Sequence, residues 1–307
     1  MKKKLLFIVG GIVIIGLIGY VFTRVGLSQP QSQSNKIHVT TSFYPLYFFA
    51  SHIAGDKATV YNITPAGAEP HDYEPTTQDV ARIEDSKLLV LNGGKLEAWG
   101  DKIKDILKNT PTVVIAVGET LANQNIIEEG ESSLDPHVWL DPVLAKKEVV
   151  IIADGLKQID PSNAEYYETN AQALESKLDN LNQAYVVGLS KCQKKDIITS
   201  HAAFGYLARQ YSFNQVSISG LSPDAEPSPQ QLANVAKFAK KNNVKYIFFE
   251  SLVSPKLSET IAHEVGAQTL VLNPIEGLSD EELAKGKNYF TEMESNLKNL
   301  RTALECE

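Results

Sequence analysis

The sequence predicts an α/β fold of two parallel-sheet lobes joined by one long helix. In both halves of the 307 residues, short apolar runs alternate with helical patterns of about 10–15 residues, an order typical of βαβ units. Between the halves, residues 162–191 read as helix, with neither glycine nor proline between Pro161 and Gly188. At 1.5 Å per residue this helix would be about 40 Å long, enough to reach from one lobe to the other.

The first half alternates between strand and helix patterns. Residues 37–43 alternate in polarity like a strand, and residues 88–92 are an apolar run typical of a buried one. Strands are expected at 37–43, 59–63, 88–92 and 112–117, and helices at 45–54, 77–86 and 99–107.

The same pattern restarts after two consecutive helices, which are expected at 142–160 and 161–191. Strands are then expected at 196–200, 215–219, 246–250 and 268–272, and helices at 201–211, 228–242, 255–265 and from Asp280. The chain therefore divides into a leader and linker, an N-terminal lobe, a linking helix and a C-terminal lobe, at residues 1–35, 36–161, 162–191 and 192–307.

The N-terminal segment has the features of a targeting signal. Lysines at positions 2–4 precede an uncharged run at 5–22, and a Ser/Gln-rich tract follows at 28–35. We expect a secretory signal or an uncleaved membrane anchor, which places the rest of the chain outside the cytoplasm, at the cell surface or in the periplasm. A lipid anchor on cysteine is not expected, because no cysteine lies near this run.

The charge and cysteine content narrow the possible partners. A formal net charge of −8 argues against nucleic acid, whose affinity comes from basic contacts to phosphate, and favours cations. Cys192 and Cys306 are too few for a disulfide framework or a four-cysteine zinc site. Outside the cytoplasm we expect them to pair with each other, with two free thiols as the alternative.

Three of the six histidines lie in loops that this fold would bring together. His71 follows the second strand, His137 precedes a helix and His201 follows the strand at 196–200. Loops at the carboxyl ends of parallel strands meet at one edge of the sheet, and neutral imidazole is the commonest metal ligand. Nearby carboxylates can orient the rings, namely Asp72, Glu74, Asp135 and Asp141. The other three are expected to be structural, namely His38, His52 and His263.

Four motifs along the chain resemble those of one protein family. They are EPHDYEP at 69–75, DPHVWLDP at 135–142, TSHAAFGY at 199–206 and DAEPSP at 224–229. In this order they resemble the zinc/manganese solute-binding proteins of metal ABC importers (cluster A-I, the ZnuA/TroA-like group). The resemblance implies two α/β lobes linked by a single long helix, with one metal ion held in the cleft between them for delivery to an ABC permease.

The resemblance also implies a set of metal ligands. His71 and His137 would come from the first lobe and His201 from the second, where manganese members typically have a glutamate. At the fourth position this chain has Asn273 in place of the family's acid, and Glu276 looks like the substitute of some zinc members. We expect Glu276 to be the fourth ligand, with Asn273 or a water as the alternatives; Asp280 lies further away.

Three imidazoles and one carboxylate form a donor set suited to Zn²⁺, whereas manganese favours more oxygen ligands. We therefore predict a monomeric zinc-binding protein that holds one Zn²⁺ per chain and is not an enzyme. A manganese or iron binder of the same family is the first alternative. Residues 123–133, which correspond to a histidine-rich metal-scavenging loop in many zinc members, contain no histidine.

A secreted zinc hydrolase is the alternative from a different class, because three histidines can also hold a catalytic zinc with a water in the fourth position. Glu276 would then be the general base rather than a ligand. The sequence has no HExxH, GxSxG, P-loop lysine or GxGxxG pattern to support an enzyme. No residue pattern points to a surface adhesion module, the third class.

Overall fold

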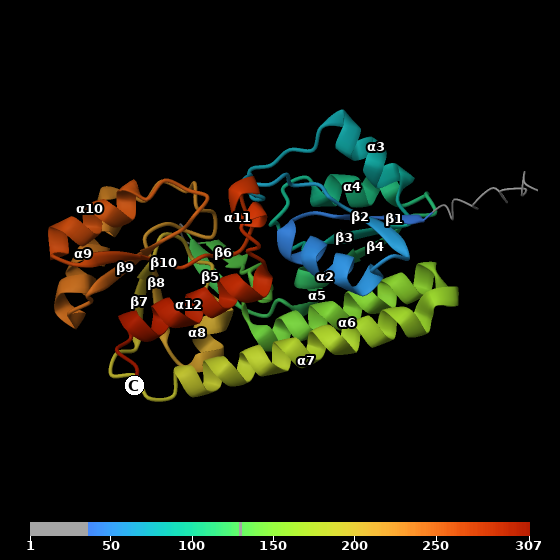
Figure 1. Cartoon of the computed structure of the whole chain (residues 1–307). Coiled ribbons are helices and arrows are strands. Elements are labelled where there is room, and N and C mark those ends of the chain that lie inside the picture. The colour runs from blue at the N-terminus through green and yellow to red at the C-terminus, as the bar shows by residue number, and fades with distance from the viewer. Residues whose placement is uncertain (1–35, 129–130) are drawn as a thin grey trace, which may run out of the picture. The chain divides into compact units, whose positions relative to one another are not determined.

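Two parallel four-stranded sheets form the framework of the structure (Figure 1). The computed structural model describes residues 36–128 and 131–307. The first sheet has the strand order β2-β1-β3-β4 and the second the order β10-β9-β7-β8. In each sheet, the strand that comes first in the sequence (β1 or β7) lies between the second (β2 or β8) and the third (β3 or β9). Open α/β sheets bind ligands where the strand order reverses in this way.

The first sheet and its helices follow the predicted order. The bounds are β1 Ile37–Thr41, α2 Tyr44–Ala54, β2 Ala58–Asn62, α3 Thr77–Asp85, β3 Leu88–Leu91, α4 Gly100–Leu107, β4 Val113–Ala116 and α5 Val117–Leu121. All four residues of β3 are buried, as expected for a strand covered on both faces. Thr76 and Asp79 form a capping box that fixes the start of α3. The short helix α5 was not predicted.

The second sheet also confirms the predicted alternation. Its elements are β7 Asp196–Thr199, α8 Gly205–Tyr211, β8 Asn214–Ser217, α9 Pro229–Asn242, β9 Tyr246–Phe249, α10 Lys256–Val265 and β10 Gln268–Val271. The prediction of a helix from His201 was wrong at its start. Residues 201–204 form a loop in which the His201 N–H donates to Glu250 and the Ala202 N–H to Gly220, so the helix begins only at Gly205.

The helix predicted from Asp280 is two helices, α11 Asp280–Ala284 and α12 Tyr289–Ala303. The break has a local cause. Gly286 has a φ of 79°, which ends the first helix, and the Asn288 side chain then accepts the N–H groups of Phe290 and Thr291 to cap the second.

An antiparallel hairpin of β5 Asn125–Glu128 and β6 Glu131–Leu134 lies in a segment where no strand was predicted. The Asp135 N–H donates to the Gln124 carbonyl at 2.9 Å and closes the base of the hairpin. The segment that leads to His137 is therefore held by its pairing with β5 and by the hydrogen bond to Gln124.

Helix α7, Ala164–Gly188, packs against α6, Pro142–Ile159, and links the two sheets (Figure 1). Near its start the Asn170 side chain donates to the Ile53 carbonyl at 3.0 Å, and near its end the Tyr185 hydroxyl donates to the Met293 carbonyl at 2.7 Å. Its buried residues recur every three or four positions, which is one helical face: Tyr167, Ala171, Leu174, Leu178, Leu181 and Tyr185. The predicted linking helix is therefore present, within residues 162–191.

One hydrophobic cluster runs through both halves of the chain. It includes Val39 of β1, Leu178 of α7, Ile197 of β7 and Leu300 of α12. Residues 37–307 accordingly form one compact unit. The division into lobes at 36–161 and 192–307 stays a prediction.

The predicted leader and linker at residues 1–35 lie outside the described residues. Among the residues that are described, no helix has the length and apolar character needed to cross a membrane.

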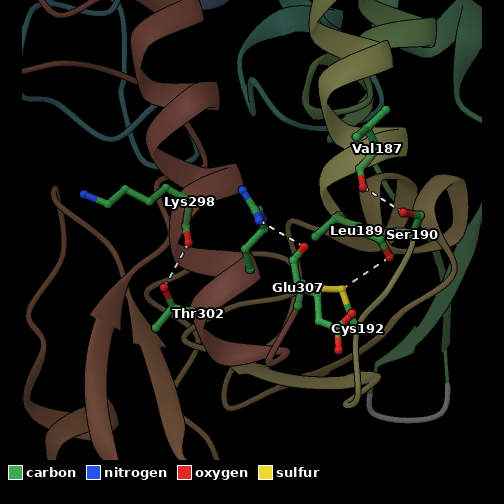
Figure 2. The surroundings of a disulfide bond; sticks show 9 residues. Val187, Leu189, Ser190, Cys192, Lys298, Thr302 and Glu307 are labelled. Carbon is green, nitrogen blue, oxygen red and sulfur yellow. Dashed lines mark hydrogen bonds between the residues drawn. A yellow bond between two sulfur atoms is a disulfide. The ribbon is translucent and has the colours of Figure 1, made fainter.

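Cys192 and Cys306 form a disulfide bond that joins residues 114 positions apart (Figure 2). The bond ties the segment after α7 to the segment after α12. Backbone hydrogen bonds accompany it, from the Lys194 N–H to the Leu304 carbonyl at 3.0 Å and from the Glu307 N–H to the Lys191 carbonyl at 3.1 Å. The predicted pairing of the two cysteines is confirmed.

Replacing both cysteines by serine should lower the free energy of unfolding by about 2–4 kcal/mol, because the bond constrains a long loop of the unfolded chain. Urea denaturation of the parent and of the double variant measures the difference. Dithiothreitol should destabilise the parent and leave the variant unchanged. An equal effect of the reductant on both proteins would contradict a stabilising disulfide.

Glu148 is a buried acid in the middle of α6. Its exposed fraction is 0%, and neither carboxyl oxygen has a hydrogen-bond partner among the described residues. Burial raises the pKa of Glu148 well above its ordinary value. The folded chain therefore keeps this carboxyl protonated at pH values where the unfolded chain ionises it.

Because the folded pKa is the higher one, the folded state is disfavoured as pH rises above about 4.3, by up to about 1.4 kcal/mol per pH unit. Glu148→Met should raise the free energy of unfolding at neutral pH by at least about 1 kcal/mol, and by less in acid. Urea denaturation at both pH values checks this. Glu165→Met, at an exposed site on α7, is the control and should show no such pH dependence. A gain that is equal at both pH values would contradict the buried-acid explanation.

Candidate metal centre

Four side chains from distant parts of the chain converge on one point. Their candidate donor atoms, one each from His71, His137, His201 and Glu276, all lie within 4.8 Å of one another. Glu276 Oε1 is 3.4 Å from the Nε2 atom of His71, 3.2 Å from that of His137 and 3.4 Å from that of His201. The Nε2 atoms of His137 and His201 are 3.3 Å apart.

These separations can be compared with the geometry of a tetrahedral zinc site. Donors about 2.0–2.1 Å from the metal at the corners of a tetrahedron lie about 3.3 Å from each other. Four of the six donor pairs, the three with Glu276 and the His137–His201 pair, have separations of 3.2–3.4 Å. The cluster therefore has nearly the dimensions of a four-coordinate site.

Each of the four side chains follows a strand. His71 lies in the loop between β2 and α3, and His201 lies two residues after β7. Glu276 lies in the loop after β10. His137 differs from the expectation, because it follows the hairpin strand β6 rather than a strand of the parallel sheet. The carboxyl ends of the parallel strands therefore supply three of the four groups.

The cluster is almost fully excluded from solvent. The side chains of His137 and His201 are 0% exposed, Glu276 is 1% exposed and His71 is 8% exposed. Among the described residues, both carboxyl oxygens of Glu276 and the Nε2 atom of His71 have no hydrogen-bond partner. Buried polar atoms without partners are costly, and a bound cation would satisfy these.

Asp135 orients the His137 ring. Its Oδ1 atom lies 2.8 Å from His137 Nδ1 and also accepts the His137 backbone N–H at 3.0 Å. When Nδ1–H donates to a carboxylate, the lone pair of Nε2 is free to face a metal. Of the other acids expected to orient rings, Asp141 instead accepts the Val143 N–H and caps α6.

Tyr206 of α8 holds the segment that contains Asp135. Its hydroxyl donates to the Asp135 carbonyl at 3.0 Å and accepts the N–H groups of Asn123 and Gln124 at 3.0 and 3.2 Å. This hydroxyl belongs to the second half of the chain, and all three of its partners belong to the first. The orientation of His137 thus depends on a contact between the halves.

Glu250 orients the His201 ring in the same way, and it was not among the residues predicted from the sequence. Its Oε1 atom lies 2.7 Å from His201 Nδ1, accepts the His201 backbone N–H at 3.2 Å and accepts the Ser200 hydroxyl at 2.6 Å. Glu250 directly follows β9, the neighbour of β7 in the sheet. Glu250 could have been predicted from its position, because it and His201 both follow the ends of strands, although 49 residues separate them in the sequence.

The charges of the cluster shift its pKa values strongly. Burial opposes protonation of His137, but the hydrogen bond to Asp135 and the nearby carboxylates of Asp135 and Glu276 outweigh it and raise the pKa of His137. At His201 the charges of Glu250 and Glu276 likewise outweigh burial and raise its pKa well above the ordinary value. Burial alone would raise the pKa of Glu276, but the positive charge of His201 and the close approach of the three imidazoles hold it well below its usual range.

Glu69 is a half-buried acid beside the cluster that was not among the residues predicted from the sequence. Burial and the Glu276 carboxylate raise the pKa of Glu69 to about 10. Its Oε1 atom accepts the His71 backbone N–H at 3.5 Å. Burial also lowers the pKa of the His71 imidazole, which keeps this ring neutral and able to bind a metal.

Two more of the acids expected near the rings lie at the surface, namely Asp72 and Glu74. Asp72 shares a hydrogen bond with Asp224 of the DAEPSP motif, and this contact raises the pKa of Asp72 to about 6. The pair joins the His71 loop to a loop of the second half.

Asn273 and Asp280, the weaker candidates for the fourth ligand, are engaged elsewhere. Asn273 Oδ1 accepts the Ile275 N–H at 2.8 Å, and its Nδ2 donates to the Ser251 hydroxyl at 3.1 Å. Asp280 is exposed in the first turn of α11. Glu276 is the residue of the three that enters the cluster.

The other three histidines lie apart from the cluster. His38 Nδ1 is 2.6 Å from Asp85 Oδ2, His52 Nδ1 is 2.7 Å from the Phe48 carbonyl, and His263 is exposed on α10. Their neighbours agree with the structural roles expected for them.

A cavity of about 580 Å³ reaches the cluster at His71. Its lining comes from both halves of the chain and includes Gly94, Pro136, Leu221 and Ser222. His71 is therefore both the most exposed of the four side chains and the one that borders an open space.

Known proteins are similar to this chain along almost its whole length. The family model described as ZnuA, zinc-uptake complex component A, periplasmic, matches residues 39–303. The high-affinity zinc uptake system protein ZnuA of Bacillus subtilis (strain 168) is 43% identical over 284 residues, 89% of either chain. The zinc-binding lipoprotein AdcA of Streptococcus pneumoniae (strain R6) is 42% identical over 294 residues, which cover 92% of this chain and 59% of AdcA.

The fold is shared as well. The crystal structure of the Zn(II)-bound ZnuA-like domain of Streptococcus pneumoniae AdcA superposes with a TM-score of 0.77 at 42% identity, covering 88% of this chain and 99% of that domain. This chain thus corresponds to one domain of AdcA and spans about three fifths of the AdcA length. With the family model matched over residues 39–303, the chain belongs to the ZnuA family of zinc-uptake components.

Proposed function

We propose that the chain captures one Zn²⁺ ion outside the cytoplasm and delivers it to the permease of an ABC importer. In this proposal His71, His137, His201 and Glu276 are the ligands. The observation that supports it most is the convergence of three imidazole nitrogens and one carboxylate oxygen at separations that suit a tetrahedral zinc ion.

The chemistry of the donors favours zinc over manganese. Three neutral nitrogens and one oxygen are a borderline set, whereas Mn²⁺ prefers carboxylate, carbonyl and water oxygens at higher coordination number. A manganese or iron cargo remains the alternative within the family.

A hydrolase would need an open coordination position and a path for substrate to reach it. Here the Glu276 carboxylate itself occupies the position beside the three imidazoles, and it is 1% exposed. The family is a component of zinc uptake and not an enzyme.

Delivery to a permease follows from the role of the relatives. The Bacillus subtilis relative is part of a high-affinity zinc uptake system, and the family description places its members in the periplasm. A membrane transporter is therefore the partner that we propose, with the chain acting as a monomer. The acidic net charge of −8 would raise the local concentration of cations near the protein.

Metal analysis tests the ligand set directly. The purified chain should hold one equivalent of zinc, measured by elemental analysis and by competition with a chelating dye. His201→Ala and Glu276→Gln should each weaken zinc binding by more than about 100-fold, because losing a ligand costs more than the 10–100-fold typical of an outer-shell change.

His263→Ala is the matched control, since this histidine is exposed on α10 and should leave zinc affinity unchanged. Manganese preferred over zinc would contradict the cargo, and an unchanged affinity in Glu276→Gln would remove Glu276 from the ligand set.

The affinity for zinc should fall as the solution becomes more acidic. Imidazole must be neutral to bind a metal, so protons compete with zinc at the three histidines. Because the surrounding carboxylates raise the pKa of His137 and His201, this competition begins above the ordinary imidazole value of about 6.5. Dye competition at about pH 7.5 and about pH 5.5, on either side of that value, measures the change. Affinity that stays constant over this interval would exclude histidines as the principal ligands.

A further inference from the structure

The backbone at Ile275, directly before Glu276, has a left-handed conformation. Its φ is 59°, a region that β-branched residues rarely adopt because their Cβ atom crowds the following carbonyl. The Ile275 side chain is fully buried. A conformation of this kind persists only where the surrounding structure enforces it, and such places cluster at functional sites.

Asn273 provides one of the enforcing contacts. Its Oδ1 atom accepts the Ile275 N–H at 2.8 Å. The backbone of Asn273 is fixed in turn by Asn296, whose Oδ1 accepts the Asn273 N–H at 2.8 Å and whose Nδ2 donates to the Asn273 carbonyl at 2.6 Å. The Nδ2 atom of Asn273 donates to Ser251 and Glu292 at 3.1 and 3.2 Å. With every polar group of Asn273 engaged, its amide oxygen is held on Ile275.

Trp139 provides a second contact, from the other half of the chain. Its indole N–H donates to the Pro274 carbonyl at 2.7 Å, and its own carbonyl accepts the Tyr289 hydroxyl at 2.6 Å. Trp139 stands two residues after His137. The turn that precedes Glu276 is thus attached to the segment that supplies another donor of the cluster.

We propose that Asn273 and Trp139 are positioning residues, which hold Ile275 in its left-handed conformation and thereby keep the Glu276 carboxylate among the three imidazoles. This inference rests on the proposed function. If Ile275 relaxed to an ordinary conformation, the chain direction at Glu276 would change and the carboxylate would leave the cluster. The residue at the position of the family's acid therefore acts on the metal through Glu276 and not as a ligand.

Cobalt spectroscopy separates this role from a general effect on folding. Co²⁺ absorbs strongly in the visible range in four-coordinate sites, and its spectrum reports the ligands. Asn273→Ala removes the acceptor for the Ile275 N–H. The Co²⁺ spectrum of this variant should match that of Glu276→Gln rather than that of the unmodified chain, and zinc affinity should fall by about tenfold or more.

Asn170→Ala is the matched control, because the Asn170 side chain also forms a hydrogen bond with a backbone group, donating to the Ile53 carbonyl, but it lies on α7 away from the cluster. This variant should keep the Co²⁺ spectrum of the unmodified chain. An unmodified spectrum and affinity in Asn273→Ala would overturn the inference. Absence of a four-coordinate spectrum in the unmodified chain would instead overturn the proposed metal site.

Asn273→Ser serves where the alanine variant fails to fold. The serine hydroxyl keeps an oxygen acceptor near the Ile275 N–H, whereas the substitution removes both N–H donors of the Asn273 amide. It should retain a larger share of the zinc affinity than Asn273→Ala, with a Co²⁺ spectrum closer to that of the unmodified chain. A spectrum that matches Glu276→Gln in the serine variant would show that the acceptor is not what positions the carboxylate.

Discussion

The arrangement of the centre and of the contacts around it depends on how the buried carboxylate of Glu276 is accommodated. A charge with 1% exposure is very costly to remove from water unless positive charge or hydrogen-bond donors surround it. Here the surroundings are three imidazoles, two from the first half of the chain and one from the second. The carboxylate is therefore accommodated only when both halves contribute, and a divalent cation at the same point would compensate it better than a proton on a ring.

The groups that orient these donors connect the two halves as well. Tyr206 of the second half holds the segment before His137, and Trp139 of the first half holds the turn before Glu276. The Gly67 N–H, in the loop that leads to His71, donates to the Leu278 carbonyl at 3.0 Å. Three loops of the centre are thus each fixed by a group from the opposite half. The geometry of the donors therefore depends on the contact between the halves.

Much of this architecture was predictable from the sequence, because buried parallel strands and amphipathic helices leave strong local patterns. The parallel strands, the helix across residues 164–188 and the Cys192–Cys306 pair were all anticipated. Two of the elements that were not predicted correctly, the hairpin and the helix break near Gly286, depend on non-local pairing or on a single backbone angle. The hairpin is held together by pairing between two short, largely polar segments, and the break at Gly286 depends on one backbone angle.

The same distinction applies to the centre. His71, His137 and His201 stand out as loop histidines, and Glu276 was identified through the family resemblance. Glu250 was missed because its partner is 49 residues away and meets it only once β7 and β9 are neighbours. The partial burial of Glu69 beside the cluster is likewise a property of the assembled fold and not of its local sequence.

Helix α7 has a mechanical consequence. It is a single uninterrupted rod of 25 residues, and the hydrophobic cluster that it shares with α2, α6 and α12 extends into both sheets. Any tilt of one sheet away from the other has to bend this rod or expose part of the cluster to water, and both cost free energy. We therefore expect the two sheets to move little relative to each other, so that separating them to open the centre requires an input of free energy.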